Sequence, residues 1–162
     1  MIRPATAADL PLILELERLS LTAAHWSEAQ YRQMLEPGSD HARLALVTQS
    51  EQGQILGFLI AHHIAPDWEL ENIVVASAAR RAGIGKQLLQ SLLKEARHRN
   101  SESIFLEVRD SNAAARALYQ STGFHQTGRR KSYYPSDGAT PAEDAILYLL
   151  ELEPGLSSSQ SS

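Results

Sequence analysis

The sequence predicts a mixed α/β protein with a mostly antiparallel sheet and helices on both of its faces. The first observation is the order of apolar runs and amphipathic stretches, which gives one strand, two helices, three strands, and then helix, strand, helix, strand, strand. The second is that only the segment from Glu69 to Val108 has the strand, helix, strand form that requires a parallel pair. The third is that two glycines, Gly83 and Gly85, let the chain turn tightly where the helix of this segment begins.

Local signals place the elements of the first half. Ile2 to Pro4 begins as a strand, and Thr6 with Asp9 three residues later favours a helix start. Ser27 with Gln30 favours the start of a second helix. Pro37-Gly38 ends that helix, and a hairpin and a further strand follow at residues 43–48, 55–64 and 69–75, with the hairpin turn at 51–53.

The second half follows from the same kinds of signal. Apolar residues repeat at helical spacing from Ile84 to Ala96, which predicts a helix that reaches about Arg99. A strand at 104–108 and a helix from about Asn112 to Thr122, which Gly123 ends, come next. We expect two last strands at 124–134 and 145–152, one domain over residues 1–153, and a disordered serine-rich tail at 154–162.

Composition narrows the function classes. The chain has 162 residues, a formal net charge of −4 and no cysteine. Without cysteine there is no disulfide framework, thiolate metal site or thiol nucleophile. The acidic balance argues against a protein that binds nucleic acid through a broad basic surface, and no window is apolar enough for a membrane span. We therefore expect a soluble, cytoplasmic protein whose partner is a small anion, a basic peptide or both.

The glycine turn carries the most informative pattern in the chain. The helix that it opens presents unpaired N–H groups and the positive end of its dipole, and the glycines let a ligand approach the backbone. Flanking cations favour a phosphate or pyrophosphate over the alternative, a tight turn with no ligand. The candidate ligand-binding residues are Arg80, Arg81, Ala82, Gly83, Ile84, Gly85 and Lys86.

These residues belong to a family resemblance that spans about Ile2 to Leu152. The chain resembles the Gcn5-related N-acetyltransferases, whose glycine loop has the pattern R/Q-x-x-G-x-G/A. The segments that carry this resemblance are Asn72-Ile73-Val74-Val75, Arg80 to Gly85, Leu106 to Arg109, Ser111 to Tyr119, and Gly123-Phe124. Within that family it is similar to the bacterial RimI branch, the ribosomal-protein alanine N-acetyltransferases, at His25-Trp26-Ser27, Arg129 to Pro135 and Glu143 to Ile146.

The resemblance implies that the central parallel strands splay at an acetyl-CoA site, with acetyl-CoA as co-substrate. It implies transfer to the N-terminal alanine of a ribosomal protein, in a ternary complex and without direct nucleic-acid binding. Backbone groups of Ile73, Val74 and Val75 would then receive the pantetheine arm as an added strand, and Asn112 would contact the cofactor. The alternative for Asn112 is a helix cap.

An amine attacks a thioester only as the free base, and an α-amine with a pKa of about 7.7–8 is mostly protonated near neutral pH. Strand alternation puts Glu107 on the face opposite Leu106 and Val108. The resemblance to RimI enzymes puts its carboxylate in the cleft as general base, directly or through a water. The alternative is an exposed glutamate paired with Arg109 or another cation.

The same resemblance assigns Tyr119 as the acid that protonates the departing CoA thiolate, with packing beside Leu118 as the alternative. Trp26 and the pair Tyr133-Tyr134 are candidates for lining a peptide groove, or they are plain packing residues. The carboxylates of Glu143 and Asp144 would favour an acceptor with basic residues behind its alanine, or merely solvate a loop. We expect no metal, because the histidines show no ligand spacing.

Two other functions stay open. One is an enzyme of the same family that acetylates a small amine such as a polyamine. The other is a non-catalytic module for acyl-CoA or a dinucleotide, since Glu107 lies about 20 residues after Gly85, as a ribose-binding acid would. Leu88 stands where the dinucleotide motif needs its third glycine. A binding module would not need Glu107 and Tyr119 together, so their co-occurrence favours catalysis.

Overall fold

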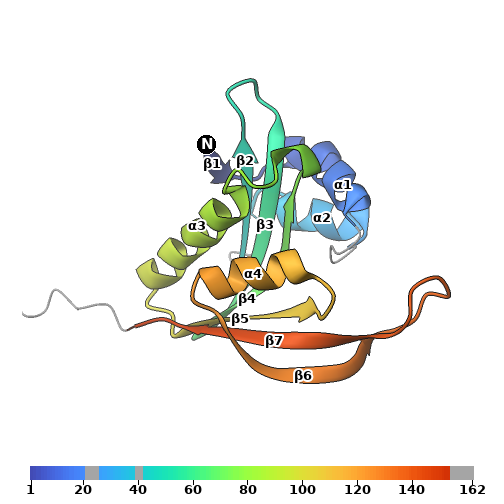
Figure 1. Cartoon of the computed structure of the whole chain (residues 1–162). Helices are drawn as coiled ribbons and strands as arrows, with labels where there is room; N and C mark the ends of the chain where they lie inside the picture. The colour runs from blue at the N-terminus through green and yellow to red at the C-terminus, as the bar shows by residue number, and fades with distance from the viewer. Residues whose placement is uncertain (21–25, 39–41, 154–162) are drawn as a thin grey trace, which may run out of the picture.

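The computed structural model describes residues 1–20, 26–38 and 42–153. In these residues seven strands form one sheet in the order β1-β2-β3-β4-β5-β7-β6, and β4 with β5 is its one parallel pair (Figure 1). The elements are β1 (Ile2–Pro4), η1 (Ala7–Asp9), α1 (Leu10–Leu19), α2 (Glu28–Leu35), β2 (Arg43–Gln49), β3 (Ile55–Ile64), β4 (Asp67–Val75), η2 (Ser77–Ala79), α3 (Ile84–His98), β5 (Ser103–Arg109), α4 (Ala113–Ser121), β6 (His125–Tyr134) and β7 (Glu143–Glu151).

The predicted fold class and order of elements are confirmed, with small shifts at the ends. The signals at the helix starts form as expected: Ser27 Oγ accepts from the N–H of Gln30 at 3.2 Å, and Gln30 Oε1 accepts from the N–H of Ser27 at 2.7 Å. At Thr6 a short 3₁₀ turn, η1, precedes α1. The predicted disordered tail and His25 lie outside the described residues. None of the described helices is long and apolar enough to span a membrane.

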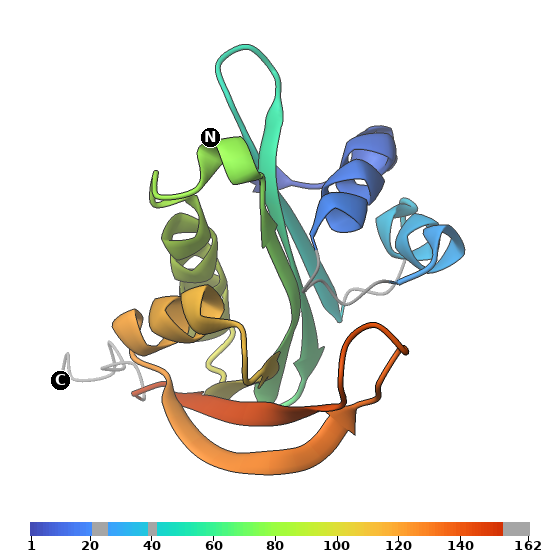
Figure 2. The same ribbon diagram turned by 45° about the vertical axis from the view of Figure 1, so that its right-hand side comes forward.

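Helices cover both faces of the sheet (Figure 2). On one face α1 and α2 bury Ile13 and Tyr31 against Phe58 of β3. On the other face α3 and α4 enclose a larger apolar cluster that includes Leu88, Leu92, Ile104, Tyr119 and Tyr148. The loop between β6 and β7 rises on the same side as α2, as Figure 2 shows.

The parallel strands β4 and β5 pair only at their beginnings. Their register runs from Asp67 opposite Ser103 to Glu69 opposite Phe105. β4 meanwhile stays paired with β3 on its other edge, up to Val75 opposite Gly57. The edge of β4 that faces β5 is therefore unpaired beyond Glu69, and we call this opening the fork.

A β-bulge in β4 sets which side chains lie beside the fork. Asn72 pairs with Ile60 and Leu70 with Ala61, so Glu71 is an extra residue in the strand. A bulge bends the strand and redirects its side chains. Leu70 packs in the α3 cluster before the bulge, and Val74 packs in the α1 and α2 cluster after it.

Candidate active site

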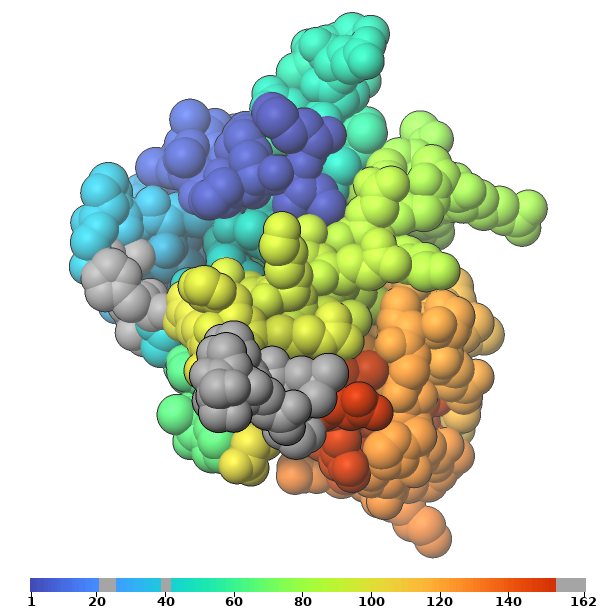
Figure 3. All heavy atoms as spheres, turned by 90° about the vertical axis from the view of Figure 1, so that its left-hand side faces the viewer, coloured from blue at the N-terminus to red at the C-terminus, as the bar shows by residue number. Residues whose placement is uncertain are grey.

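The N-terminus of α3 is open in the way that the glycine turn predicts. Gly83 caps the helix in the left-handed region, with φ of +78°, and a Cβ on it would meet nothing within 4 Å. The first backbone hydrogen bond of the helix runs from the N–H of Gln87 to the carbonyl of Gly83, at 3.0 Å, so the N–H groups before Gln87 have no helical acceptor. Figure 3 shows the chain around residue 80 projecting between the β2–β3 hairpin and α4.

The structure separates two groups within this turn. Arg80, Arg81, Ala82, Gly83 and Lys86 are exposed, whereas Ile84 and Gly85 are buried. Gly85 is buried because α4 packs closely there: a Cβ on it would lie 3.0 Å from Leu118 Cδ2. Three exposed cations, free N–H groups and the neighbouring unpaired edge at Ile73, Val74 and Val75 fit a ligand with both a pyrophosphate and an amide-bearing arm. Acetyl-CoA has both.

Asn112 caps the N-terminus of α4, which is the alternative to a cofactor contact that the sequence analysis gave for this residue. Its Oδ1 accepts from the N–H of Ala115 at 3.1 Å. This bond leaves the side-chain NH₂ group available as a donor. A cofactor contact at Asn112 therefore remains a prediction beside the observed cap.

Glu107 lies on the face of β5 opposite the α3 cluster, as strand alternation predicts, because Leu106 and Val108 on either side are buried in that cluster. Its cationic neighbour is Arg130 of β6, with Nη2 3.6 Å from Glu107 Oε1. The sequence analysis named Arg109 or another cation as the possible ion-pair partner of Glu107, and in the structure that partner is Arg130. Arg109 instead contacts Glu143 at 3.6 Å.

The tyrosine pair lies beside Glu107 because β6 bulges there. Its register shifts between Arg130 and Tyr134, and Ser132 at the shift has φ of +51°. The charge on Glu107, followed by a hydrogen bond to Glu107, raises the pKa of Tyr133. Burial, followed by the same charge, raises the pKa of Tyr134. Both tyrosines therefore keep their protons and can act as donors at this site.

Tyr119 is more buried than expected, at 5% exposure, within the α3 and α4 cluster. Its ring packs on Phe124 and Tyr148, with centroids 5.7 and 6.1 Å away. Burial, and then the charge of Tyr134, raises its pKa. No hydrogen bond of its hydroxyl is formed within the described part of the chain, so this group is free to donate to a ligand. Glu107 and Tyr119 thus lie on opposite faces of the sheet.

Glu69 is a site residue that the sequence analysis missed. It is the last residue of β4 that pairs with β5, so it stands where the fork opens. Burial, and then the charges of Glu71 and Glu107, raises its pKa. The available signal was the alternation of acidic and apolar side chains from Asp67 to Glu71, but a single sequence does not say that this strand edge becomes unpaired.

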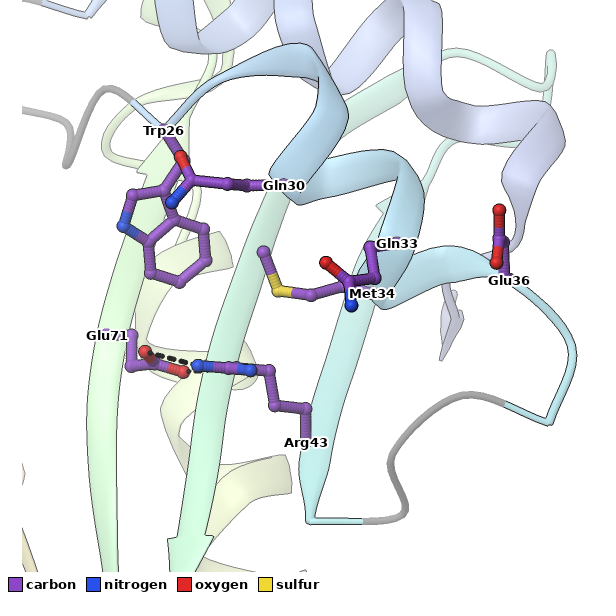
Figure 4. A pocket seen from close by; sticks show the side chains of 7 residues that line it. All are labelled: Trp26, Gln30, Gln33, Met34, Glu36, Arg43 and Glu71. Carbon is purple, nitrogen blue, oxygen red and sulfur yellow. Dashed lines mark hydrogen bonds and ion pairs between the residues drawn. The ribbon is translucent and has the colours of Figure 1, made fainter.

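Trp26 lines a pocket between α2 and the sheet (Figure 4), and the lining does not include Tyr133 or Tyr134. The pocket has a volume of about 610 Å³ (Figure 4). Glu71 forms part of its lining and holds Arg43 through two contacts, Nε to Oε1 at 2.9 Å and Nη2 to Oε2 at 3.2 Å. The lining residues are Trp26, Gln30, Gln33, Met34, Glu36, Arg43 and Glu71.

The two carboxylates of the β6–β7 loop are engaged within the chain. Glu143 accepts from the N–H of Ser111 and pairs with Arg109. Asp144 accepts from the N–H of Ser132 at 2.9 Å and from Arg129 at 2.9 Å. These contacts lower the pKa of both carboxyl groups. They organise the loop, so the acidic surface available to an acceptor lies on β4 and β5 instead.

Among the described residues one group could hold a metal ion: ligand atoms of His62, Glu69 and Glu71 lie within 4.8 Å of one another. Arg43 already binds both oxygens of Glu71, and its positive charge opposes a second cation there. The chemistry of this side-chain set therefore agrees with the expectation of a site without metal.

Comparison with known proteins identifies the family. The Acetyltransferase (GNAT) family model matches residues 10–124. The [ribosomal protein bS18]-alanine N-acetyltransferase of Escherichia coli strain K12 is 35% identical over 145 residues, which cover 89% of this chain and 92% of the relative. The enzyme of the same name from Haemophilus ducreyi is 32% identical over 156 residues, covering 94% of this chain and all of the relative.

Similar solved structures support the same family assignment. The ribosomal-protein-S18-alanine N-acetyltransferase of Escherichia coli has a TM-score of 0.79 at 32% identity and covers 94% of each chain. The ribosomal-protein-alanine N-acetyltransferase of Brucella melitensis has a TM-score of 0.81 at 30% identity, covering 94% of this chain and 99% of its own. The chain therefore belongs to the GNAT acetyltransferase family and uses acetyl-CoA as its co-substrate.

Proposed function

We propose that this protein transfers the acetyl group of acetyl-CoA to the N-terminal α-amine of a ribosomal protein that begins with alanine. The observation that carries the proposal is the fork between β4 and β5 together with the open N-terminus of α3, with Glu107 on one face of the sheet and Tyr119 on the other. The names of the relatives support the acceptor. A cytoplasmic location belongs to the proposal, because ribosomal proteins are made there.

The residues around α3 bind the nucleotide end of the co-substrate. The N–H groups at Gly83 to Lys86 receive the pyrophosphate, and Arg80 and Arg81 add charge. The unpaired edge of Ile73 to Val75 pairs with the pantetheine amides and directs the thioester into the fork. Acetyl-CoA supplies the acetyl group as an activated thioester.

Glu107 accepts the proton that the α-amine must lose before its nitrogen can attack the acetyl carbon. The C–N bond forms and the C–S bond breaks. Tyr119 donates its hydroxyl proton to the departing sulfur from the opposite face. Glu69 adds negative charge at the fork, which attracts the acceptor as an ammonium ion before it is deprotonated.

The peptide acceptor is favoured over a small amine because the pocket at Trp26 lies beyond the fork on the same side of the sheet as Glu107. Ligand atoms of Glu71, in the pocket, lie within 4.8 Å of those of Glu69, at the fork. A peptide acceptor continues beyond its reacting amine and needs room past the fork, which this pocket offers.

The test is acetylation of matched acceptors. A peptide with a free N-terminal alanine should be acetylated on its α-amine, as located by fragment masses. The same peptide with a blocked N-terminus but a free lysine should be a poor acceptor, and spermidine should be slower still in kcat/KM. Faster turnover of spermidine than of every peptide would contradict the proposal and favour the small-amine alternative.

A further inference from the structure

We propose that Asp144 is a positioning residue for the acetyl transfer: its carboxylate holds the bulge of β6 in the shape that presents Tyr133 to Glu107. Asp144 acts through Tyr133 and not on the reacting atoms. This inference rests on the proposed function, in which Glu107 is the base that deprotonates the acceptor amine.

The bulge of β6 is a strained piece of backbone. The strand keeps its register with β7 up to Arg130 and resumes it only at Tyr134. Between them Ser132 has φ of +51°, in the left-handed region. A residue with a Cβ is unfavourable there, so this conformation persists only where neighbouring contacts hold it. Tyr133 follows Ser132 directly and takes its position from this backbone.

Asp144, at the start of β7, supplies the contact that holds Ser132. Its Oδ1 accepts from the Ser132 N–H at 2.9 Å, and its Oδ2 accepts from Arg129 Nη1 at 2.9 Å. The same Arg129 nitrogen donates to Asp110, just after β5, at 2.8 Å. Asp110 in turn accepts from Arg116 of α4 at 2.8 Å. The Asp144 carboxylate therefore ties the bulge to β5 and α4, the elements that carry the proposed base and acid.

The network matters more for geometry than for stability. Its charged side chains are 27–39% exposed, and ion pairs at such exposure contribute only about 0–1 kcal/mol. Breaking one of them should leave the protein folded. The loss of the bond to the strained Ser132 should show in the position of Tyr133 instead.

Tyr133 needs this support because packing does little to fix its ring, which is 47% exposed. β6 also lies two strands from β5, about 10 Å away in a regular sheet. Arg130 spans the gap, with Cζ 5.5 Å from the Tyr133 ring centroid and Nη2 3.6 Å from Glu107 Oε1. The charge on Glu107 raises the pKa of Tyr133, so its hydroxyl stays protonated and can donate to the carboxylate. Such a donor fixes the orientation in which Glu107 meets the amine.

A double-mutant cycle tests whether Asp144 acts through Tyr133. Asp144→Ala removes both contacts of the carboxylate and should lower kcat about tenfold, as should Tyr133→Phe, while the KM for acetyl-CoA stays unchanged. The double variant should be no slower than either single variant, because both changes remove the same interaction. A wild-type kcat in Asp144→Ala, or losses that multiply to about a hundredfold in the double variant, would overturn the inference.

Two further variants keep the test specific. Asp137→Ala is the matched control, because Asp137 is a carboxylate of the same β6–β7 loop that accepts from two backbone N–H groups of its own loop. Its kcat should equal that of the wild type, and a loss as large as that of Asp144→Ala would overturn the inference. If Asp144→Ala does not fold, Asp144→Asn takes its place in the cycle. Its amide keeps an oxygen for the Ser132 N–H but loses the ion pair with Arg129, so kcat should fall less and again add nothing to the loss in Tyr133→Phe.

A spectroscopic readout separates this inference from the proposed function. With carbon-13 at tyrosine Cζ, the Tyr133 resonance, identified by its absence in Tyr133→Phe, should move in Glu107→Gln because a neighbouring charge is lost. In the Asp144→Ala background Glu107→Gln should leave it unmoved, and an equal response in both backgrounds would overturn the inference. The kinetics use the best acceptor that the enzyme has, so faster turnover of spermidine than of every peptide would reject the proposed acceptor alone.

Discussion

Glu107 and Tyr119, the base and the acid of the proposed reaction, lie in two different environments. Glu107 is half-buried on a strand, near the Arg130 cation and the Tyr133 hydroxyl. Tyr119 is buried in an apolar cluster, which raises its pKa and keeps it protonated through the working pH range. A carboxylate that accepts protons and a phenol that holds one are the protonation states that the proposed transfer requires.

Replacing Glu107 with glutamine should lower kcat on the order of 10²-fold, the usual effect of removing a general base. The loss should shrink as pH rises through about 7.7–8, because the free amine then forms without help. Steady-state kinetics from pH 6 to 9 would measure this, with Glu151→Gln, at the exposed last residue of β7, as control. A loss that does not depend on pH would contradict the assignment of the base.

Tyr119→Phe should slow the reaction on the order of 10²-fold while leaving the melting temperature close to that of the wild type, because the hydroxyl of Tyr119 bonds to none of the described residues and the ring packing is kept. Tyr148→Phe gives the contrast, since its hydroxyl accepts from Arg116 and Gln120. That variant should lose stability and keep its rate per folded molecule. Full activity of Tyr119→Phe would remove it from the chemistry.

At the scale of elements, the strand–helix unit from β4 to β5 positions both halves of the site. The helix begins at Gly83 because a left-handed residue there ends the preceding turn and exposes the N–H groups of α3. The same connection brings β5 back beside β4 for only a short parallel register. One crossover therefore provides the open N-terminus of α3 and the fork.

Gly83→Val should weaken CoA binding by at least about tenfold, because the new side chain would stand in the open space in front of these N–H groups. Gly38→Val is a matched control: Gly38 has the same φ of +78° and equally open surroundings, so both variants carry the same backbone strain of about 1–2 kcal/mol. Calorimetry should find normal CoA affinity in Gly38→Val only. Equal affinities in the two variants would exclude the cradle.

The elements themselves could be predicted because their signals are local. The capping pair of Ser27 and Gln30 and the glycine turn each lie within a few residues of the element that they start. The open start of α3 at the glycine turn could be predicted for the same reason. Strand alternation predicted the face of β5 on which Glu107 lies, and its role as base stays a prediction.

The missed features depend on contacts between distant parts of the chain. The bulge at Glu71 is a matter of register with β3, and no residue type near it specifies an extra position. Arg130 reaches Glu107 across β7, so its choice over the nearby Arg109 depends on strand order. The Trp26 indole packs against the ring of Tyr31. The hydroxyl of Tyr31 in turn accepts a hydrogen bond from Asn72, 41 positions away, at 2.9 Å.

At the scale of the whole molecule, an ion pair ties the first strand to the first helical turn. Arg3 of β1 donates from Nη1 and Nη2 to the two oxygens of Asp9, each at 2.8 Å, and the Asp9 side chain is nearly buried. The carboxylate also accepts from the N–H of Thr6. The hydrogen bond from Arg3 lowers the pKa of Asp9, since it favours the ionised form.

A carboxyl whose pKa is lower in the folded state stabilises the fold above its unfolded pKa, about 3.9, and this stability is lost as pH falls through the folded value. Asp9→Asn should therefore cost about 1–3 kcal/mol at pH 7 and progressively less below pH 4. Urea unfolding at several pH values would measure it, with the exposed Glu15→Gln as control. A cost that is constant down to pH 2 would contradict the role of this pair.

The most direct test of the central claim is to identify what the enzyme acetylates in a mixture of its proposed substrates. Small-subunit ribosomal proteins with free N-termini would be incubated with the enzyme and acetyl-CoA, and the N-terminal peptides read by mass spectrometry. The account predicts one acetyl group on the α-amine of a protein that begins with alanine, and its loss with Glu107→Gln. Acetylation confined to lysine side chains, or an unmodified mixture beside an enzyme that acetylates polyamines, would contradict it.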